Sequence, residues 1–430
     1  MSNQFLNAVE YSNVMLLLLK NQLVTGRLVD GQFKDQVTDE NGLIINVKRP
    51  PRFIAKSGAT LQAQDLVTGS VPVTVDQYTN VHISIGDLEY VQSYNALMQN
   101  ETMKSAASTL AHKIDSFLQD KTLGFHSWVS GASTGGVNML TANAAKSIAS
   151  PVQAMGAHTR LMSQGCPNAN LSATVQFVDG ELIRGSLLGS FTPQINVTAL
   201  ERVKIPLISE IDWYATQQNP TLTTGTRTGT AEAVVGGATN VNYRDVKTTM
   251  SQNLPVDNTT GATDTYKKGE VFTISGVYAW DWRRQQKLPY LQQFTLLADA
   301  AAVGNAVTFS ISPPIIVQGT NDGVSTDANT AFATVDSIPA DDATLTFIGA
   351  ASTGYTVRSA WHKQAIALVS ARLQMPFTGV ASFAVDPDTG IAIRYWRGSD
   401  ISTGAHVHRW DMIYGAQVMD PFLGTRVGGS

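Results

Sequence analysis

The stretch from Tyr94 to Leu123 most constrains the fold of this chain, because it predicts one long amphipathic helix. Its apolar residues at helical spacing are Met103, Ala107, Leu110, Ile114 and Phe117. Charged residues fall mostly between them, and Gly124 is a typical helix stop. A helix of this length measures about 45 Å, longer than the average globular helix. The sequence therefore predicts a rod with one buried face.

A β-rich arm precedes this helix. Leu43–Val47 reads as a short strand, and apolar residues alternate with other residues in 71–75 and again in 81–85. The intervening stretch is polar and contains the basic, proline-bearing run Lys48–Arg52. A long hairpin with so little core of its own is unstable alone. We therefore expect something outside the subunit to hold this arm. A further helix is expected at about Phe5 to Val24.

The remainder of the chain predicts mixed structure followed by a β-rich region. In 125–219 we expect helices at Val152–Met162 and Leu182–Leu188 and a strand at Ser172–Val178. After Pro220 the composition turns to Thr, Gly and Asn, and short β runs recur. These runs are 271–274, 294–297, 307–311, 315–317 and 345–348. They predict a small β-barrel or sandwich inserted at 221–350, after which Lys363–Val369 reads as a helix or a buried strand.

Composition narrows the functional classes. Only 15% of the 430 residues are charged, against roughly 25% in an ordinary soluble domain, so we expect other subunits to cover much of the surface. The net charge of −4 argues against a nucleic-acid-binding surface. The single cysteine, Cys166, excludes an internal disulfide and reads as a small buried residue. The apolar run Val14–Leu19 is too short to cross a membrane.

Two motifs suggest chemistry, and each has a plainer explanation. Gly131–Gly135 matches the hydrolase pattern around Ser133, but that pattern needs a strand leading into the serine, and here a helix precedes it. A turn is therefore favoured. His406 and His408 project from one face of a strand, with Asp411 as the nearby acid, and a solvated or interface strand is favoured over a metal site. We predict no catalytic, cofactor or metal site.

Three segments resemble capsid proteins of tailed double-stranded DNA bacteriophages with the Hong Kong 97-type fold, in the short-tailed-phage branch that carries an inserted β-barrel. The first is 268–278 with 291–294, similar to core strands of the inserted domain. The second is 365–369 leading into Met375-Pro376. The third runs from 393–396 to 408–415, similar to the terminal strands that close such proteins. The order of elements also matches over nearly the whole chain.

The resemblance implies an α+β fold with an N-terminal arm, an extended loop, a long spine helix, and peripheral and axial domains. The implied segments are an N-terminal arm at 1–36, the extended loop and peripheral strands at 37–93, the spine helix at 94–124, an α/β core at 125–220, the inserted β-barrel at 221–350 and the return to the core at 351–430. In such families the extended loop lies across a neighbouring subunit.

The implied function is that of a major capsid protein, not an enzyme. Its copies would form the hexamers and pentamers of an icosahedral shell around phage DNA, which it would enclose without reading its sequence. The partners implied are a separate scaffolding protein, expected because no long N-terminal extension is present, and a portal protein. Synthesis in the bacterial host cytoplasm is implied, with no membrane association. The alternatives are another virion component, such as a tail or decoration protein, and, more remotely, a hydrolase using Ser133.

Five residues are candidates for contacts between subunits. Arg49, Arg52 and Lys56 lie in the extended loop and could pair with acids of a neighbour, and the alternative is a solvated basic loop. The Thr/Gly-rich stretch from about Gly236 to Arg244 is expected to meet a neighbour as well, which adds Arg244 and Asp245 to the candidates.

Overall fold

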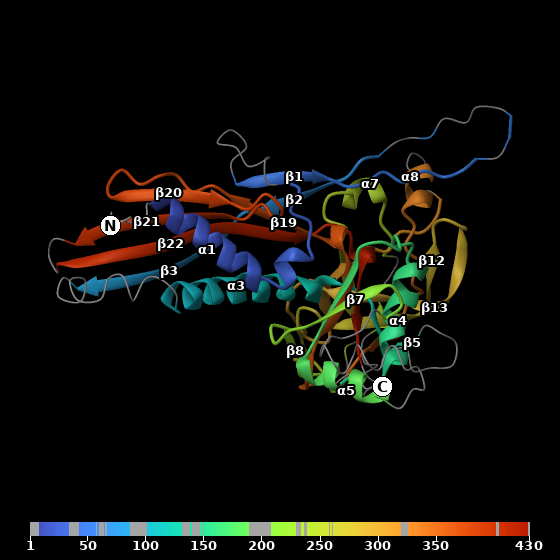
Figure 1. Cartoon of the computed structure of the whole chain (residues 1–430). Coiled ribbons are helices and arrows are strands. Elements are labelled where there is room, and N and C mark those ends of the chain that lie inside the picture. The colour runs from blue at the N-terminus through green and yellow to red at the C-terminus, as the bar shows by residue number, and fades with distance from the viewer. Residues whose placement is uncertain are drawn as a thin grey trace. The chain divides into compact units, whose positions relative to one another are not determined.

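A computed structural model describes residues 8–33, 43–56, 58–59, 64, 67–86, 101–130, 138–139, 147–148, 150–188, 208–228, 234–235, 239–257, 259, 261–319, 326–400 and 404–428. The chain divides into two compact units (Figure 1). Unit 1 takes in 1–47, 72–121 and 366–417, and unit 2 takes in 48–71, 122–365 and 418–430.

Unit 1 is built on one sheet, with strand order β19-β22-β21-β20 and with β3 also paired to β22, and β20, β21, β22 and β3 pair antiparallel. The strands are β3 (Gln77–Gly86), β19 (Ile366–Ala371), β20 (Val380–Val385), β21 (Ala392–Asp400) and β22 (Ala405–Val418). The register pairs Tyr395 with Trp410 and Arg394 with Asp411. Since neighbours along a strand point to opposite faces, these two pairs lie on opposite faces of the sheet.

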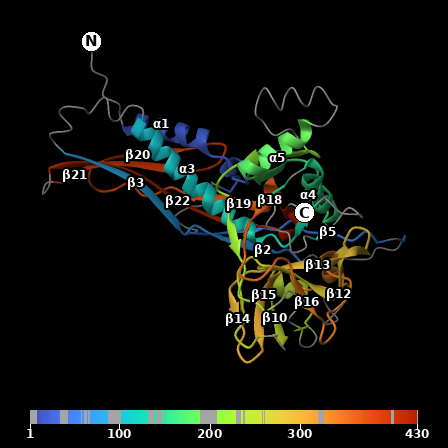
Figure 2. The same ribbon diagram turned by 90° about the horizontal axis from the view of Figure 1, so that it is seen from below.

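Two helices cover one face of this sheet (Figure 2). They are α1 (Ala8–Gln22) and α3 (Glu101–Lys121). Tyr11 of α1 stacks on Tyr395 at 5.4 Å between ring centroids, and Phe117 of α3 meets Tyr414 edge-on at the same distance. α3 lies within the predicted helix, whose first residues, 94–100, fall outside the described part. Both helix predictions are confirmed.

A buried carboxylate joins the end of α1 to α3. The backbone N–H groups of Val24 and Gly26 both donate to the Asp115 carboxylate at 2.9 Å. They lie around the short helix η1 (Thr25–Arg27), and Gln119 adds a hydrogen bond to the Thr25 hydroxyl at 2.8 Å. Burial raises the pKa of Asp115, and these backbone donors oppose the rise. The N-terminal helix is therefore held to α3 by hydrogen bonds as well as by packing.

Unit 2 contains a mixed sheet with strand order β5-β4-β23-β18-β6-β7. Its strands are β4 (Trp128–Ser130), β5 (Asn138–Met139), β6 (Leu171–Val175), β7 (Ile211–Ala215), β18 (Arg358–His362) and β23 (Gly424–Val427). Two helices accompany it, α4 (Pro151–Ser163) and α5 (Phe177–Leu188). Pro151 opens α4, where its missing N–H is not needed. The core between helices and sheet includes Leu161, Val175 and Trp213.

A second, antiparallel sheet of unit 2 has strand order β16-β12-β13-β15-β10-β9. Its strands are β9 (Val234–Val235), β10 (Gln252–Asp257), β12 (Val271–Asp281), β13 (Gln286–Leu296), β15 (Val307–Ser312) and β16 (Leu345–Phe347). Phe272 packs on Phe294 at 5.7 Å and on Phe347 at 5.4 Å, both between ring centroids. Each buried phenylalanine contributes roughly 1.5–3 kcal/mol of transfer free energy. This aromatic cluster is the centre of the sheet's own core.

The remaining elements are short. Three two-stranded pairs join β1 (Ile44–Lys48) to β2 (Ser70–Thr74), β8 (Thr221–Thr223) to β17 (Gly354–Thr356), and β11 (Thr265–Tyr266) to β14 (Ala300–Ala301). The short helices are α7 (Tyr243–Val246), α8 (Thr326–Ala331), η3 (Thr122–Gly124), η4 (Lys363–Ala365) and η5 (Pro421–Leu423). None of the described helices is both long and apolar enough to span a membrane.

Most predicted elements are present, with two corrections. The strand expected at 172–178 ends at Val175, because Asp179 accepts the Gln176 N–H at 3.0 Å and starts helix α5. The run at 315–317 is buried loop rather than strand, apart from one bridge between Val317 and Val335. The stretch 363–369, left open between helix and strand, is a short helix followed by β19. That 221–350 forms an inserted barrel stays a prediction.

Candidate subunit-contact site at the root of the extended loop

We use the term loop root for residues 48–56 and 67–71, the two ends of the extended loop within unit 2. The loop root packs on a small apolar core made by α7 and α8, with Tyr243, Val246, Met250, Ile316 and Phe332 among its buried members. Ile54 and Val67, one from each end of the loop, pack against this core. The expectation that only a neighbouring molecule could hold the arm is therefore too strong for the loop root, because unit 2 supplies a core beneath it.

Arg49 lies almost fully buried in the loop root, with 5% of its surface exposed. Its Nη1 donates to the Lys247 carbonyl at 2.8 Å, and its Nη2 donates to the Met419 carbonyl at 3.1 Å. A fixed guanidinium fork suits such a set of acceptors better than an ammonium does. Arg49 thus ties the loop root to two other segments of the same unit.

Arg52 lies among three aromatic rings. Its guanidinium carbon is 5.0 Å from the centre of Trp282, 5.1 Å from Phe332 and 5.8 Å from Phe422. Its Nη2 also lies 3.2 Å from Asp420 Oδ2, and both side chains are mostly buried. Cation–π contacts of this kind are worth about 0.5–2 kcal/mol each, more when desolvated. Arg52 is therefore anchored within its own subunit.

The other three candidates lie around the same core. Lys56 Nζ forms an ion pair with Asp327 of α8 at 2.9 Å. Arg244 and Asp245 lie on α7 with exposed side chains, next to the buried Tyr243. The structure therefore brings all five candidates to one region of unit 2. Arg49, Arg52 and Lys56 contact other segments of the unit, and Arg244 and Asp245 have exposed side chains. Contact with a neighbouring subunit stays a prediction for each of them.

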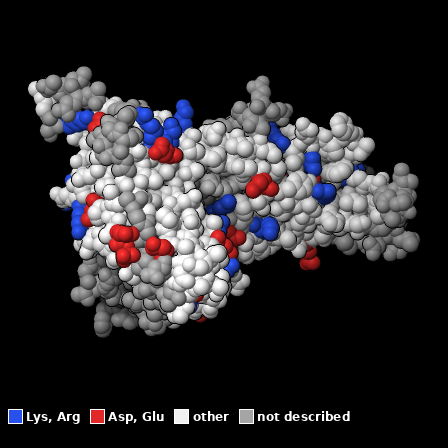
Figure 3. Space-filling view, turned by 180° about the vertical axis from the view of Figure 1, so that it is seen from behind, with Lys and Arg blue, Asp and Glu red and all other residues white. Residues whose placement is uncertain are grey.

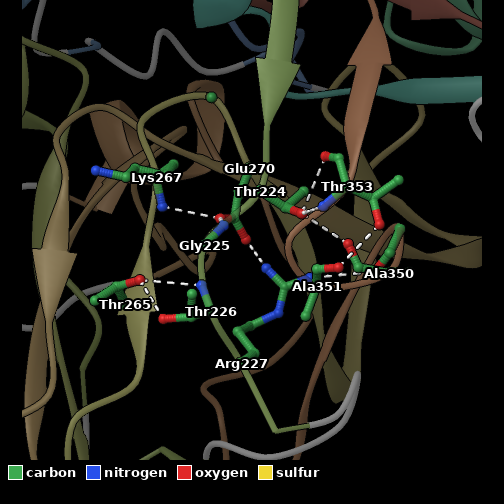
Figure 4. A network of polar contacts seen from close by, with 12 residues as sticks. Thr224, Gly225, Thr226, Arg227, Thr265, Lys267, Glu270, Ala350, Ala351 and Thr353 are labelled. Atoms are coloured by element: carbon green, nitrogen blue, oxygen red, sulfur yellow. Dashed lines mark hydrogen bonds and ion pairs between the residues drawn. The ribbon is translucent and has the colours of Figure 1, made fainter.

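A second polar cluster lies where the chain enters and leaves the antiparallel sheet of unit 2, and we call it the junction network (Figure 4). It joins 224–227, where the chain leads toward this sheet, to 265–270 and to 349–353, where the chain leaves it. Arg227 forms an ion pair with Glu270, and its Nη2 donates to the Gly349 carbonyl at 3.1 Å. Glu270 Oε1 accepts from Gly225 N at 2.6 Å and from Lys267 N at 2.9 Å. A Cβ at Gly225 would overlap the Thr265 carbonyl, so only glycine fits there.

Arg426 and Gln293 connect the two large sheets of unit 2. Arg426, on β23, donates to the carbonyls of Gly269 (2.5 Å) and Leu123, and burial lowers its pKa to about 9. Gln293, on β13, accepts from the Trp128 N–H at 2.8 Å and donates to the Trp128 carbonyl at 3.0 Å. The side-chain amide of Gln293 therefore pairs with the backbone of β4 in the way that a neighbouring strand would. The two sheets are joined by buried polar contacts as well as by the chain itself.

Neither the Ser133 motif nor the pair His406 and His408 forms a catalytic or metal site among the described residues. Ser133 and its flanking glycines lie outside the described residues. His408 is fully buried rather than solvated, because its Nδ1 lies 2.7 Å from the Tyr395 hydroxyl under α1, and burial lowers its pKa to about 4. Among the described residues, no group of three or more His, Cys, Asp or Glu is placed to hold a metal. On the face in Figure 3, acidic and basic side chains lie in small scattered groups between wide uncharged areas.

The partners that hold the loop root have no signal in the local sequence. Trp282, Phe332, Phe422 and Asp420 are far apart in the chain, and the periodicity around them does not indicate that they meet. The available signal was the run Lys48–Arg52 itself, because two prolines restrict the backbone beside two arginines, but this signal does not identify the partners.

Comparison with known proteins gives the family. The model of the P22 coat protein family (gene protein 5) matches residues 15–429. Among solved structures, that of Mycobacterium phage Che8 has 12% identity and a TM-score of 0.44, over 95% of this chain and 93% of that one. The PhiM1 bacteriophage mature capsid has 9% identity and a TM-score of 0.41, over 92% and 84%. The CUS-3 coat protein I-domain has 23% identity and a TM-score of 0.20, over 28% and 96%. The comparison with curated proteins gave no match.

These findings define a phage capsid protein, a component of the virion shell. The chain belongs to the P22 coat protein family. The predicted fold class, α+β of the Hong Kong 97 type, and the predicted function, a major capsid protein of an icosahedral shell, are confirmed by this membership. Its copies assemble with one another into capsid shells.

Proposed function

We propose that this major capsid protein assembles into hexamers and pentamers through an extended loop that is fixed at its root and reaches a neighbouring subunit. The observation that carries the proposal is the anchoring of Arg52 by Asp420 and three aromatic rings. Association costs more when a flexible segment must be ordered on binding. A loop held at both ends over an apolar core has part of this cost removed before it meets a neighbour.

The five candidates then divide into two roles. Arg49 and Arg52 act on assembly indirectly, by positioning the loop, because their hydrogen-bonding groups are engaged inside the subunit. Arg244 and Asp245 on α7 are exposed and contact a neighbour directly. Lys56 holds the far side of the loop root through Asp327. Many modest contacts of this kind give a stable closed shell through multivalency.

The experiment compares Arg52→Ala, Arg52→Lys and Asp420→Asn in the full chain, measuring shell yield by sedimentation and subunit folding by circular dichroism. If Arg52 works through its internal anchor, Asp420→Asn lowers the yield nearly as much as Arg52→Ala, and Arg52→Lys restores only part of it. Folded Arg52→Ala subunits that form shells at the normal yield contradict the proposal. A loss with Arg52→Ala but none with Asp420→Asn assigns Arg52 to an acid of the neighbour instead.

The remaining partners follow from the same function. We infer that a separate scaffolding protein directs assembly, that a portal protein occupies one vertex, and that double-stranded DNA is enclosed without sequence-specific contacts. The net charge of −4 supports the last point, because a strongly basic lining would hold DNA through its phosphates and hinder its release. Co-expression with a candidate scaffold tests the first inference, and closed shells formed at equal yield without it argue against a scaffold.

We also infer that the protein has no catalytic activity. The support is the structural role of its family, together with the sequence context of Ser133, which lacks the strand expected before a nucleophile. A fluorophosphonate probe applied to the folded protein tests this inference. Labelling that is lost in Ser133→Ala would overturn it.

A further inference from the structure

The face of the unit 1 sheet opposite the helices is open to solvent and carries a hollow. On β3, the side chains of Tyr78, Asn80, His82 and Ser84 all point to this face and are exposed. On β21 and β22, the same face carries Trp396 opposite Arg409 and Gly398 opposite Val407. The four residues on β21 and β22, together with the turn at Gly379, line a hollow of about 440 Å³. A sheet with one face packed on helices and the other in water is common, but a hollow in that open face is not required by the fold.

Gly398 makes the hollow. It lies within β21, where glycine weakens a strand and often marks the close approach of another backbone. A Cβ built on Gly398 meets nothing within 4 Å, so the space above it is empty and local packing does not require glycine. Its backbone is also not in the left-handed region. The conformation of β21 therefore gives no reason for glycine at this position, whereas an incoming segment would.

The positive charge beside the hollow favours binding of an acidic segment. Arg409 Nε lies 2.5 Å from Asp411 Oδ1, and Arg394 Nη2 lies 2.7 Å from Asp411 Oδ2, so two guanidinium groups share one buried carboxylate. Arg409 Nη2 also donates to the Tyr78 hydroxyl at 2.8 Å, which fixes its fork beside the hollow. One positive charge remains uncompensated by this cluster. Arg372, over the ring of Phe383 at 5.2 Å, adds another on the same side of the sheet.

We propose that this hollow, lined by Trp396, Gly398, Val407 and Arg409, receives an acidic extended segment of a second copy of the chain. A second copy fits because the family assembles with itself and because the chain carries 34 acidic against 30 basic residues, so a locally positive surface attracts other copies. Duplex DNA fits less well, because its binding depends on many basic groups that each neutralise a phosphate, and the described part of this face offers three arginines, two of them shared with Asp411.

The inference rests on self-assembly but not on the loop root. The test uses Gly398→Val, which places a branched side chain at the floor of the hollow in a residue type that strands favour, and Arg409→Gln, which removes the charge. Asn80→Val, on the same face outside the hollow, and Lys104→Gln, exposed on α3, are the matched controls. Shell yield is measured by sedimentation over a series of NaCl concentrations, subunit folding by thermal unfolding, and DNA binding by retention of linear duplex DNA on a filter.

We expect Gly398→Val and Arg409→Gln to fold and to lower shell yield at least 10-fold, while both controls assemble normally. Arg409→Gln should also flatten the salt dependence of assembly, which a purely structural role would leave unchanged. Normal yield from folded Gly398→Val overturns the proposal, as does a loss of DNA binding without a loss of assembly. Because Gly398 lies outside the loop root, normal assembly of Gly398→Val together with failure of Arg52→Ala refutes the hollow and leaves the loop proposal standing.

Discussion

The guanidinium of Arg227 and the carboxylate of Glu270 form an ion pair in which the two side chains are 0% and 1% exposed. The pair joins segment 224–227, which leads toward the antiparallel sheet of unit 2, to the turn before β12. Glu270 also accepts two backbone N–H groups, so its charge is satisfied from three directions. A closed pair of this kind contributes little net stability but is costly to break. It fixes how the chain enters and leaves this sheet.

Removing one partner of this pair should therefore destabilise unit 2 strongly. Arg227→Met leaves the Glu270 carboxylate buried without its counter-ion, and we expect the free energy of unfolding to fall by about 3–5 kcal/mol. Denaturant unfolding of the full chain measures this. The double variant Arg227→Met with Glu270→Gln should recover part of the loss, because the glutamine oxygen still accepts the Gly225 and Lys267 N–H groups. Equal stability of Arg227→Met and the native chain would show that Glu270 is not buried away from water.

Asp115 should control how firmly the N-terminal helix is held. Asp115→Ala leaves the N–H groups of Val24 and Gly26 without their acceptor, at a cost of roughly 1–3 kcal/mol. We expect limited proteolysis to cut near 22–28 much sooner than in the native chain, while unit 2 stays resistant. Lys113→Ala, exposed on the same helix, is the matched control and should not change the cleavage rate. Unchanged cleavage in Asp115→Ala would exclude this contact as the restraint.

His126 should make the subunit acid-sensitive. Its ring is fully buried beside Arg160, and burial, the larger cause, together with that charge lowers its pKa to about 3. The depressed pKa means that the unfolded chain takes up this proton first, near its ordinary value of about 6.5. The stability is therefore complete above that value and falls as the pH drops toward 3, with a loss of about 2 kcal/mol at pH 5.

The measurement for His126 is the unfolding free energy at pH 7.5 and at pH 5. His126→Asn can still donate to the Pro421 carbonyl, which lies 3.0 Å from Nδ1 in the native protein, but cannot titrate. We expect its stability to depend less steeply on pH than that of the native chain. Other titrating groups, including His408, are common to both proteins and cancel in the comparison. Identical slopes would rule out His126 as a source of the acid sensitivity.

Cys166 should be inert in the folded protein. Its side chain is buried, and burial, helped by the charge of Asp420, raises the pKa of the thiol to about 12. The thiolate that reacts with maleimides and disulfides is therefore almost absent at neutral pH. We expect labelling by N-ethylmaleimide to require unfolding, and to follow the unfolding transition in denaturant. Rapid labelling of the native subunit would place the thiol at the surface.

The long helices and the strands with a strong local signal, such as β2 and β3, could be predicted. The three-four spacing in 101–121 and the alternation in 71–75 each arise from one buried face, which a single sequence displays. Arg49 and Arg52 show the limit of such reasoning. Their charge made them candidates for pairing with acids of a neighbour, but their partners, Met419 and Asp420, lie about 370 residues further along the same chain. A charged side chain in a sequence does not show whether its partner lies in its own chain or in another.

In the proposed assembly, the extended loop is held at its root by its own subunit and is completed by a second copy. Electron cryo-microscopy of the full chain, produced together with a candidate scaffolding protein, tests this most directly. The account predicts closed shells in which the Arg52–Asp420 contact lies within one subunit and the loop beyond it crosses to the next. A protein that stays monomeric under every assembly condition, or a shell in which Arg52 meets an acid of the neighbour, would contradict it.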